Sequence, residues 1–244
     1  MIIASFESNH INTLVLCSFS SLHLGSENDL RFVYCACAIS QILNDWTGVD
    51  MDAAVKYIQS CRTWDGAISL IPGQESHGGS TFCGIASLKL MGRLKEVLDD
   101  DDTFSWRNDL VQWCVSRQIE GLQGRPNKLE DTCYSYWIGG TLQILNCDHL
   151  LEQELLREFV MDCQTDMGGF SKLRDGSYYP DLLHSFYSLS WLSLSHTGNK
   201  EAIANGAHLV SNERETFILH PLDCSLGMSC RRIDMYRKNK LNSS

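Results

Sequence analysis

The sequence predicts an all-α protein, and three observations support this fold class. Apolar residues recur at helical spacing over most of the 244 residues. Segments that alternate apolar and polar residues between turn signals, as half-buried strands do, are absent from the sequence. The chain has only four prolines, and all fall outside the apolar runs, at Pro72, Pro126, Pro180 and Pro221. We therefore expect helices joined by loops.

Seven segments carry apolar residues three or four positions apart, a spacing that places those residues on a shared helix face. In chain order, the expected helices are residues 29–46, 51–61, 80–92, 105–118, 131–145, 150–164 and 181–194. These helices form repeats. Each of three units has a helix that ends near Arg62, Gln118 or Gln164, then a glycine-rich loop, then a second apolar helix.

The two helices of each unit differ in polarity. The second helix is apolar on nearly all sides, whereas the first carries charges. This contrast predicts an inner ring of second helices inside an outer ring of first helices, which is an α/α toroid. Stacked helical pairs could equally form an open solenoid, and the repeats alone leave both architectures open.

Composition limits the classes of function. A net charge of −10 argues against a broad nucleic-acid footprint, because such a footprint needs a basic face. Eleven cysteines lie scattered through apolar segments, and no Lys or Arg precedes Arg31. The odd cysteine number and the missing basic leader favour a reducing compartment, so we expect a cytoplasmic protein.

Basic side chains recur in the loops that precede the second helices. His77 precedes one of them, Arg125 and Lys128 precede the next, and Lys172 precedes the third. If the second helices point the same way around a ring, these side chains converge at one end, where helix N-termini add partial positive charge. That end would bind a polyanion such as a diphosphate. The alternative is that each residue is a solvated loop cation.

Three further residues have the types that bind catalytic zinc. Asp131 and Cys133 fit one ion if Asp131 is the N-cap and Cys133 lies in the first helical turn. His184 holds a comparable first-turn position after Asp181, the expected cap of the last helix. Three ligands of these types leave one position open, as catalytic zinc sites do. Without zinc, Asp131 is a cap and Cys133 a core residue.

The segments ESHGGSTFCGIASLKLMG, GRPNKLEDTCYSYW and PDLLHSFYSLSWLSL resemble the β subunits of protein prenyltransferases, those of type I protein geranylgeranyltransferases in particular. The resemblance implies an α/α barrel over residues 29–221 that forms a heterodimer with a separate α subunit. Residues 1–28 would be an atypical segment in place of the family's early repeats, and residues 222–244 a C-terminal tail.

The resemblance also implies roles for single residues. Asp131, Cys133 and His184 would bind one Zn²⁺. The residues matched to substrate binding are His77, Arg125, Lys128 and Tyr134 at the diphosphate, Arg31 and Tyr34 in the cavity wall, and Trp137 against the isoprenoid. Lys172 stands where farnesyltransferases carry a magnesium-binding Asp, so Mg²⁺ is not expected and the ammonium would replace it.

The reaction implied is transfer of a geranylgeranyl group from geranylgeranyl diphosphate to the cysteine of a C-terminal Caax box, as in small GTPases, through a zinc-bound thiolate. Asp131, Cys133, His184, Lys172 and Tyr134 would be the catalytic residues. Three alternatives remain: a farnesyltransferase β subunit, a shortened β-like chain that binds the α subunit without catalysing, and a terpene cyclase on a related fold. The acid motif of a cyclase is not evident, and the acidic run 99–102 fits a solvated loop.

Overall fold

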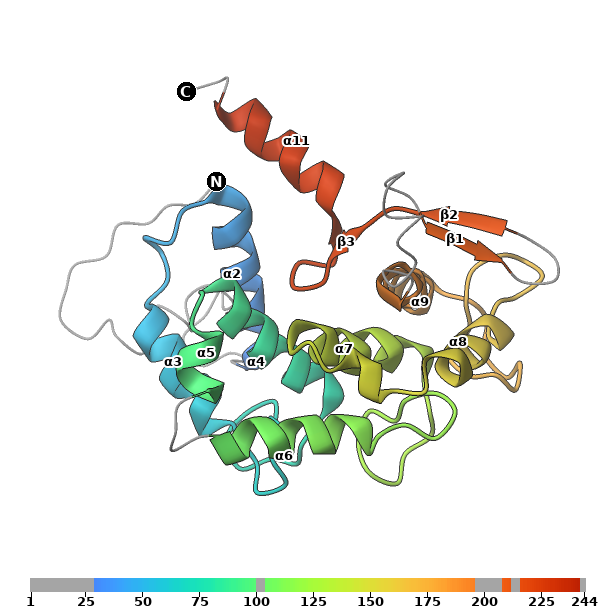
Figure 1. Ribbon diagram of the computed structural model, residues 1–244, viewed down its shortest axis with the longest axis horizontal. Helices are drawn as coiled ribbons and strands as arrows, with labels where there is room; N and C mark the ends of the chain where they lie inside the picture. The colour runs from blue at the N-terminus through green and yellow to red at the C-terminus, as the bar shows by residue number, and fades with distance from the viewer. Residues whose placement is uncertain (1–28, 100–103, 196–207, 212–215, 242–244) are drawn as a thin grey trace.

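The computed structural model describes residues 29–99, 104–195, 208–211 and 216–241 (Figure 1). The expected N-terminal segment, residues 1–28, and residues 100–102 of the acidic run lie outside the described residues. The boundary of that segment therefore stays a prediction.

The all-α fold is confirmed, and each expected helix is present within a few residues of its predicted ends. The main helices are α2 (Leu30–Leu43), α3 (Met51–Ser60), α4 (Gly78–Leu90), α6 (Phe104–Val115), α7 (Thr132–Ile144), α8 (Gln153–Asp162) and α9 (Leu182–Ser195). Shorter or later helices are α5 (Leu94–Leu98), the 3₁₀ turn η1 (Asp148–Leu150) and α11 (Cys230–Leu241). None of the described helices is long and apolar enough to cross a membrane.

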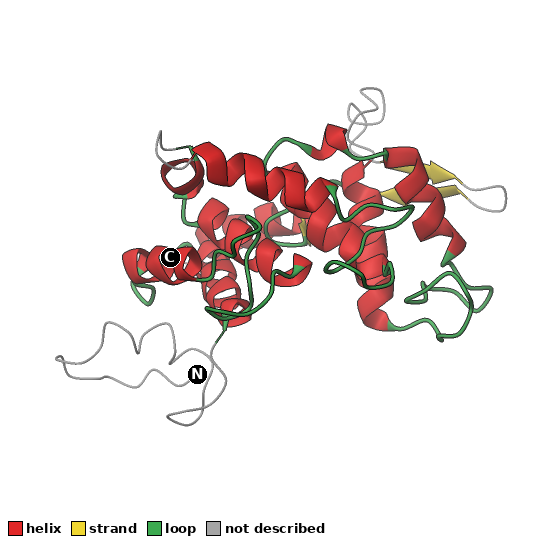
Figure 2. Ribbon diagram, turned by 90° about the horizontal axis from the view of Figure 1, so that it is seen from below, coloured by secondary structure: helices red, strands yellow, loops and turns green. Residues whose placement is uncertain are grey.

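Two small antiparallel sheets were not expected. The strands β1 (His208–Ser211) and β2 (Thr216–Leu219) pair with each other, as do β3 (Leu222–Asp223) and β4 (Met228–Ser229). Figure 2 shows the β1–β2 pair (yellow arrows) at one end of the mostly helical body. Strands of two to four residues are too short to show an alternating pattern, which is why the sequence did not reveal them.

The helices form two layers, as the polarity contrast predicts. The inner layer is an arc in which α2 packs on α4, α4 on α7, and α7 on α9. Figure 1 shows α3, α6 and α8 on the outside of this arc. Nearly every residue of α4 and α7 is buried, whereas the outer helix α3 buries one side, with Ala54, Val55 and Ile58. On α9, Leu182, Leu183 and Phe186 remain exposed.

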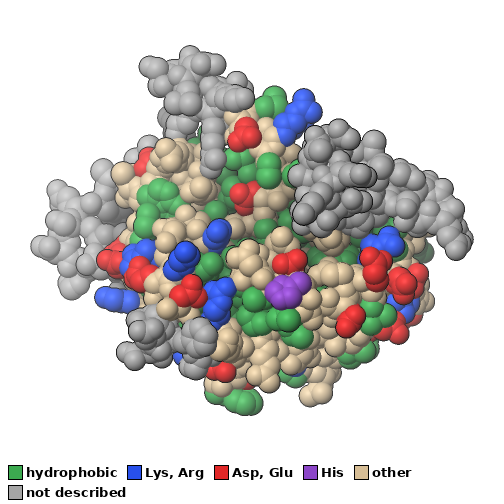
Figure 3. Space-filling model, in the orientation of Figure 1, with side chains coloured by type: hydrophobic (Ala, Val, Ile, Leu, Met, Phe, Trp, Pro, Cys, Tyr) green, Lys and Arg blue, Asp and Glu red, His purple; other side chains and the backbone are tan. Residues whose placement is uncertain are grey.

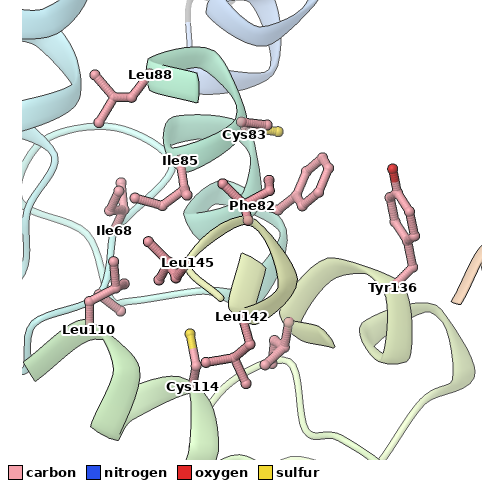
Figure 4. Packing of buried hydrophobic residues seen from close by; sticks show 14 of the residues in the cluster. Ile68, Phe82, Cys83, Ile85, Leu88, Leu110, Cys114, Tyr136, Leu142 and Leu145 are labelled. Atoms are coloured by element: carbon pink, nitrogen blue, oxygen red, sulfur yellow. The ribbon is translucent and has the colours of Figure 1, made fainter. Parts of the chain in front are cut away.

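The core fills the space between the two layers. Figure 4 shows Ile85 of α4, Leu110 of α6 and Leu145 at the end of α7 pointing toward one another. Ile85 and Leu110 are fully buried, and so is Ile68 in the loop that leads into α4. Ile68 anchors the loop that leads to the N-terminus of α4, where the expected site lies.

Backbone hydrogen bonds repeat from unit to unit and fix the loops. In each unit an amide after the loop's first turn donates to a carbonyl at the end of the outer helix: Ser69 to Cys61 at 2.9 Å, Gln123 to Arg117 at 3.0 Å, and Ser171 to Cys163 at 2.8 Å. Each loop then accepts a bond from the first amide of the preceding inner helix: Leu70 from Leu30, Gly124 from Gly78, and Lys172 from Thr132. Because first-turn amides lack partners within a helix, these bonds clasp each inner helix to the next unit.

The β3–β4 hairpin lies over the concave side of the arc. The Tyr34 hydroxyl of α2 donates to the Ser225 carbonyl at 2.9 Å, and the Tyr136 hydroxyl of α7 donates to the Cys224 carbonyl at 2.8 Å. The hairpin thereby ties two inner helices together.

Candidate functional site

The site begins with the caps of the inner helices. Asp29, His77 and Asp131 each accept a hydrogen bond from the backbone amide two residues ahead, and Asp181 accepts one from the amide of His184. Because the inner helices lie side by side, the dipoles of their N-termini favour an anion at this end.

Asp131, Cys133 and His184 meet across α7 and α9. Their ligand atoms all lie within 4.8 Å of one another. The Asp131 Oδ1 atom is 3.3 Å from His184 Nε2, and it also accepts the Cys133 amide at 2.9 Å. His184 Nδ1 donates to Asp181 Oδ2 at 2.6 Å, which leaves Nε2 to face the other two residues. A carboxylate that accepts a hydrogen bond from the other ring nitrogen commonly holds a metal-ligating histidine in this way.

The donor set fits zinc. Asp, Cys and His are all zinc ligands, and three protein ligands leave a fourth position for a substrate. The pairing that the sequence could only suggest is therefore geometrically possible, with Asp131 as the cap and Cys133 in the first turn. The roles of the three residues as ligands stay a prediction.

The ionisable groups of this cluster shift one another's pKa. Burial and the adjacent Asp131 carboxylate raise the pKa of the Cys133 thiol, so the metal-free cysteine is protonated at neutral pH. Burial alone would raise the pKa of Asp131, but hydrogen bonds from His184 and Cys133 lower it. The Asp131 and Asp181 carboxylates raise the pKa of His184 against the effect of its burial. A metal that binds here must displace the thiol proton, so metal affinity rises with pH.

A cavity of about 300 Å³ opens beside this cluster. Its lining includes six of the residues singled out from the sequence: His77, Arg125, Lys128, Asp131, Tyr134 and Lys172. Lys172 Nζ lies 3.7 Å from Asp131 Oδ2, so the cation-lined cavity and the candidate metal cluster share one carboxylate. The loop cations therefore converge, as the repeat positions predict.

The remaining predicted residues lie elsewhere. Tyr34 and Trp137 belong to an aromatic cluster with Phe82, Tyr136 and Tyr187, in which neighbouring ring centroids are 4.2–5.6 Å apart. This cluster lies deeper along the inner helices than the caps. Arg31 does not line the cavity; its guanidinium binds the Asp29 carboxylate, with Nη2 2.6 Å from Oδ2.

Sequence reasoning missed three features of the cavity. Glu75 forms an ion pair with Arg125, and Tyr178 lies under the Lys172 ammonium, which is 5.6 Å from the ring centroid. Gly124 leaves room for Tyr134, because a Cβ atom at Gly124 would collide with that ring. The glycine in the loop sequence was the one available signal. The ion pair joins two separate loops, and the Tyr178–Lys172 contact depends on how a single loop folds.

On the face seen in Figure 3, acidic and basic side chains are interspersed, with hydrophobic atoms exposed between them.

Comparison with known proteins agrees with this architecture. Residues 7–226 match the prenyltransferase α/α toroid domain. The chain belongs to this family. The family fold is a toroid, which decides between the ring and the open solenoid that the repeats left open.

Two relatives within the family have the same name. The chain is 48% identical over 182 residues to the geranylgeranyl transferase type-1 subunit beta of Arabidopsis thaliana, covering 72% of this chain and 48% of that protein. It is 41% identical over 166 residues to the subunit of the same name from Dictyostelium discoideum, covering 68% and 45%. The chain thus spans about half the length of these relatives.

A solved structure is similar as well. The Candida albicans protein geranylgeranyltransferase-I complexed with GGPP matches with a TM-score of 0.71 and 27% identity, over 87% of this chain and 57% of that chain. The predicted resemblance to prenyltransferase β subunits, with the type I geranylgeranyltransferases foremost, is confirmed.

Proposed function

We propose that this chain is the β subunit of a type I protein geranylgeranyltransferase. It would transfer a geranylgeranyl group from geranylgeranyl diphosphate to the cysteine of a Caax box. The observation that carries the proposal is the contact between two sites: the Lys172 ammonium of the cation-lined cavity lies 3.7 Å from Asp131 of the candidate metal cluster. A diphosphate and a thiol could therefore be held side by side. Relatives of this name support the assignment.

Asp131, Cys133 and His184 would hold one zinc ion. When bound, zinc would supply a Lewis acid that keeps a substrate thiol ionised at neutral pH. His184 is oriented for this by Asp181, whose Oδ2 accepts a hydrogen bond from Nδ1–H. Cys133, whose burial favours the neutral thiol, must lose its proton as the ion binds.

The reaction forms a bond between sulfur and C1 of the isoprenoid and breaks the bond from C1 to the diphosphate oxygen. Negative charge then builds on the departing diphosphate. Arg125, Lys128 and Lys172 line the cavity that would receive it and stabilise that charge, together with the helix N-termini. The aromatic cluster around Trp137 offers an apolar surface for the lipid tail. Lys172 supplies a fixed positive charge, so no Mg²⁺ is required.

The active species would be a heterodimer with a prenyltransferase α subunit, and its protein substrates would be Caax-box proteins such as small GTPases. No nucleic-acid partner is proposed, and the expected cytoplasmic location stays a prediction. A protein farnesyltransferase subunit beta from Pyricularia oryzae is also related, at 31% identity over 205 residues. Farnesyl transfer is therefore the second candidate.

Prenyl transfer by the chain co-expressed with an α subunit tests the proposal. Labelled geranylgeranyl diphosphate and farnesyl diphosphate are each offered with a peptide that ends in a Caax box with terminal Leu. The proposal expects label on the peptide, faster with the geranylgeranyl donor, and none on a matched peptide with Ser in place of Cys. Faster farnesyl transfer would favour the second candidate. No transfer from either donor would contradict both and leave the alternative of a β-like chain that does not catalyse.

A further inference from the structure

The last helix is a basic element in an acidic chain. α11 spans Cys230–Leu241 and has the sequence CRRIDMYRKNKL. Five of the chain's 20 Lys and Arg residues lie in these 12 residues, against a single Asp. The whole chain, by contrast, has a net charge of −10. The positive charge of α11 is therefore set apart from the acidic remainder of the molecule.

Arg231 and Arg232 are exposed and unpaired, unlike the other arginines with described side chains. Neither forms an ion pair with any residue that the structure describes. Arg117 packs over the Trp113 ring, with 5.1 Å between its guanidinium carbon and the ring centroid. Each of the others forms an ion pair with a carboxylate: Arg31, Arg62, Arg93, Arg107, Arg125, Arg157 and Arg174. The two guanidinium groups at the start of α11 therefore remain available to an anion outside the chain.

One face of α11 combines a cation with exposed apolar side chains. Arg232, Met235 and Tyr236 are three and four residues apart, which places them on the same side of the helix. Met235 and Tyr236 are 45% and 43% exposed, whereas Ile233 is buried. Helices that lie in a membrane interface have such a face, because apolar side chains enter the headgroup region and Arg reaches the phosphates with its long stem. Tyr is typical of that depth.

α11 is fixed at its base and leads away from the inner helices. The Cys230 amide donates to the Pro221 carbonyl at 3.1 Å, and β3 pairs with β4 directly before the helix. The hairpin is held in turn by the hydroxyls of Tyr34 and Tyr136. Among the described elements, α11 contacts β4 most, and Figure 1 shows it (red) extending from the hairpin away from α7 and α9. Its exposed face is thus open to a flat surface.

We propose that α11 docks the protein on an anionic membrane surface, with Arg231 and Arg232 at the lipid phosphates and Met235 and Tyr236 in the interface. The five cations supply most of the affinity, because each Lys or Arg near an anionic bilayer raises partitioning about fivefold. The same lipids repel the acidic remainder, so the α11 side of the molecule faces the bilayer. The cation-lined cavity is built from residues before α9, so this surface is separate from the candidate site and does not depend on the proposed function.

Other anionic partners fit this helix less well. Nucleic acid needs a broad basic face, and a chain with a net charge of −10 offers only α11 for it. An acidic protein segment would neutralise Arg231 and Arg232 but offers little apolar cover for Met235 and Tyr236. A lipid surface supplies phosphates and acyl chains at adjacent depths, so it satisfies both kinds of side chain.

Co-sedimentation of the full chain with lipid vesicles tests the docking. Vesicles of phosphatidylcholine alone should not bind it, whereas vesicles with about a third phosphatidylserine should, and added salt should release the chain. The double variant Arg231→Gln/Arg232→Gln should lower the partition coefficient about 25-fold, which is fivefold for each charge. Lys56→Gln/Lys95→Gln is the matched control, because it removes two exposed cations from α3 and α5. It should bind like the unchanged chain, and both double variants should melt like it.

A second comparison separates a membrane from an acidic protein partner. Met235→Ser/Tyr236→Ser keeps every cation of α11 but removes the apolar side chains. It should bind the anionic vesicles at least about fivefold more weakly and bind soluble poly-glutamate like the unchanged chain. Tighter binding to poly-glutamate than to vesicles, with no effect of the serine variant on either, would assign α11 to an acidic protein and overturn the proposal. Failure to bind anionic vesicles at low salt, or equal losses in the arginine and lysine variants, would overturn it as well.

Discussion

Replacing Asp131 by Asn and by Ala should separate its structural role from its chemical role. Asp131 is buried and caps α7, with Oδ1 2.9 Å from the Cys133 amide. The same carboxylate faces Lys172 and His184. Asn keeps an oxygen at the capping position but removes the negative charge, whereas Ala removes both.

The two substitutions differ in their expected effect on stability. Asn and Asp are equally good N-caps, so Asp131→Asn should change the free energy of unfolding by less than about 0.5 kcal/mol through the cap. Asp131→Ala leaves the Cys133 amide without its partner and should cost about 1 kcal/mol. In a chain of this size that lowers the melting temperature by roughly 2–4 °C. Both variants lose a charged ligand, so each should bind zinc at least about 10- to 100-fold more weakly.

Thermal melting of the metal-free chains and competitive zinc titration measure the two effects. Asp50→Ala is the matched control, because Asp50 caps the outer helix α3, where its Oδ1 lies 2.9 Å from the Ala53 amide, away from the site. It should lose similar stability and keep its zinc affinity. Unchanged zinc affinity in Asp131→Asn would show that Asp131 is only a cap. A loss of stability in Asp131→Asn equal to that in Asp131→Ala would refute the reasoning about the cap.

Three further predictions concern the Lys172 ammonium, the stability of the fold at acid pH and the packing of the core. Transfer should persist when EDTA removes magnesium and zinc is resupplied, and Lys172→Asp should create a magnesium requirement; strict magnesium dependence of the unchanged chain would contradict this. Hydrogen bonds from two hydroxyls and the Trp113 indole outweigh burial and lower the pKa of Asp65. This stabilisation is fully present above the unfolded pKa of about 3.9 and disappears as the pH falls through the lower pKa of the folded state. Asp65→Asn should therefore weaken the decline of the unfolding free energy at acid pH, measured by urea unfolding. An unchanged decline would argue against it. Leu142→Ala, at a fully buried position of α7, should cost about 2–5 kcal/mol in the same assay, and a loss below about 1 kcal/mol would mean that the core is packed differently.

The helices were predictable because their signals are local. Apolar spacing marks each helix, and the repeats indicate that their second members share a direction. From that alone it follows that Arg125, Lys128 and Lys172 should converge, and they do line one cavity. The cap role of Asp131 and the first-turn place of Cys133 were accessible for the same reason.

The remaining details depend on contacts between segments that are distant in the sequence. The ion pair of Glu75 with Arg125 joins two loops, and the hydrogen bond of His77 with Tyr134 joins the starts of two helices. Periodicity cannot show either contact. Arg31 differs, because its partner Asp29 is two residues away, so this local ion pair could have been expected from the sequence. The place of Arg31 in the substrate cavity wall stays a prediction.

Transfer measured while zinc is titrated tests the central claim most directly. The chain is co-expressed with an α subunit, stripped of metal and given labelled geranylgeranyl diphosphate and a Caax peptide. The account predicts that the rate of transfer rises with zinc and reaches its plateau at about one ion per chain, as expected for a single three-ligand site. Cys133→Ala should stay inactive at every zinc level, whereas Cys163→Ala, at a buried cysteine of the outer layer, should follow the unchanged chain. Full zinc-dependent transfer by Cys133→Ala would contradict the account.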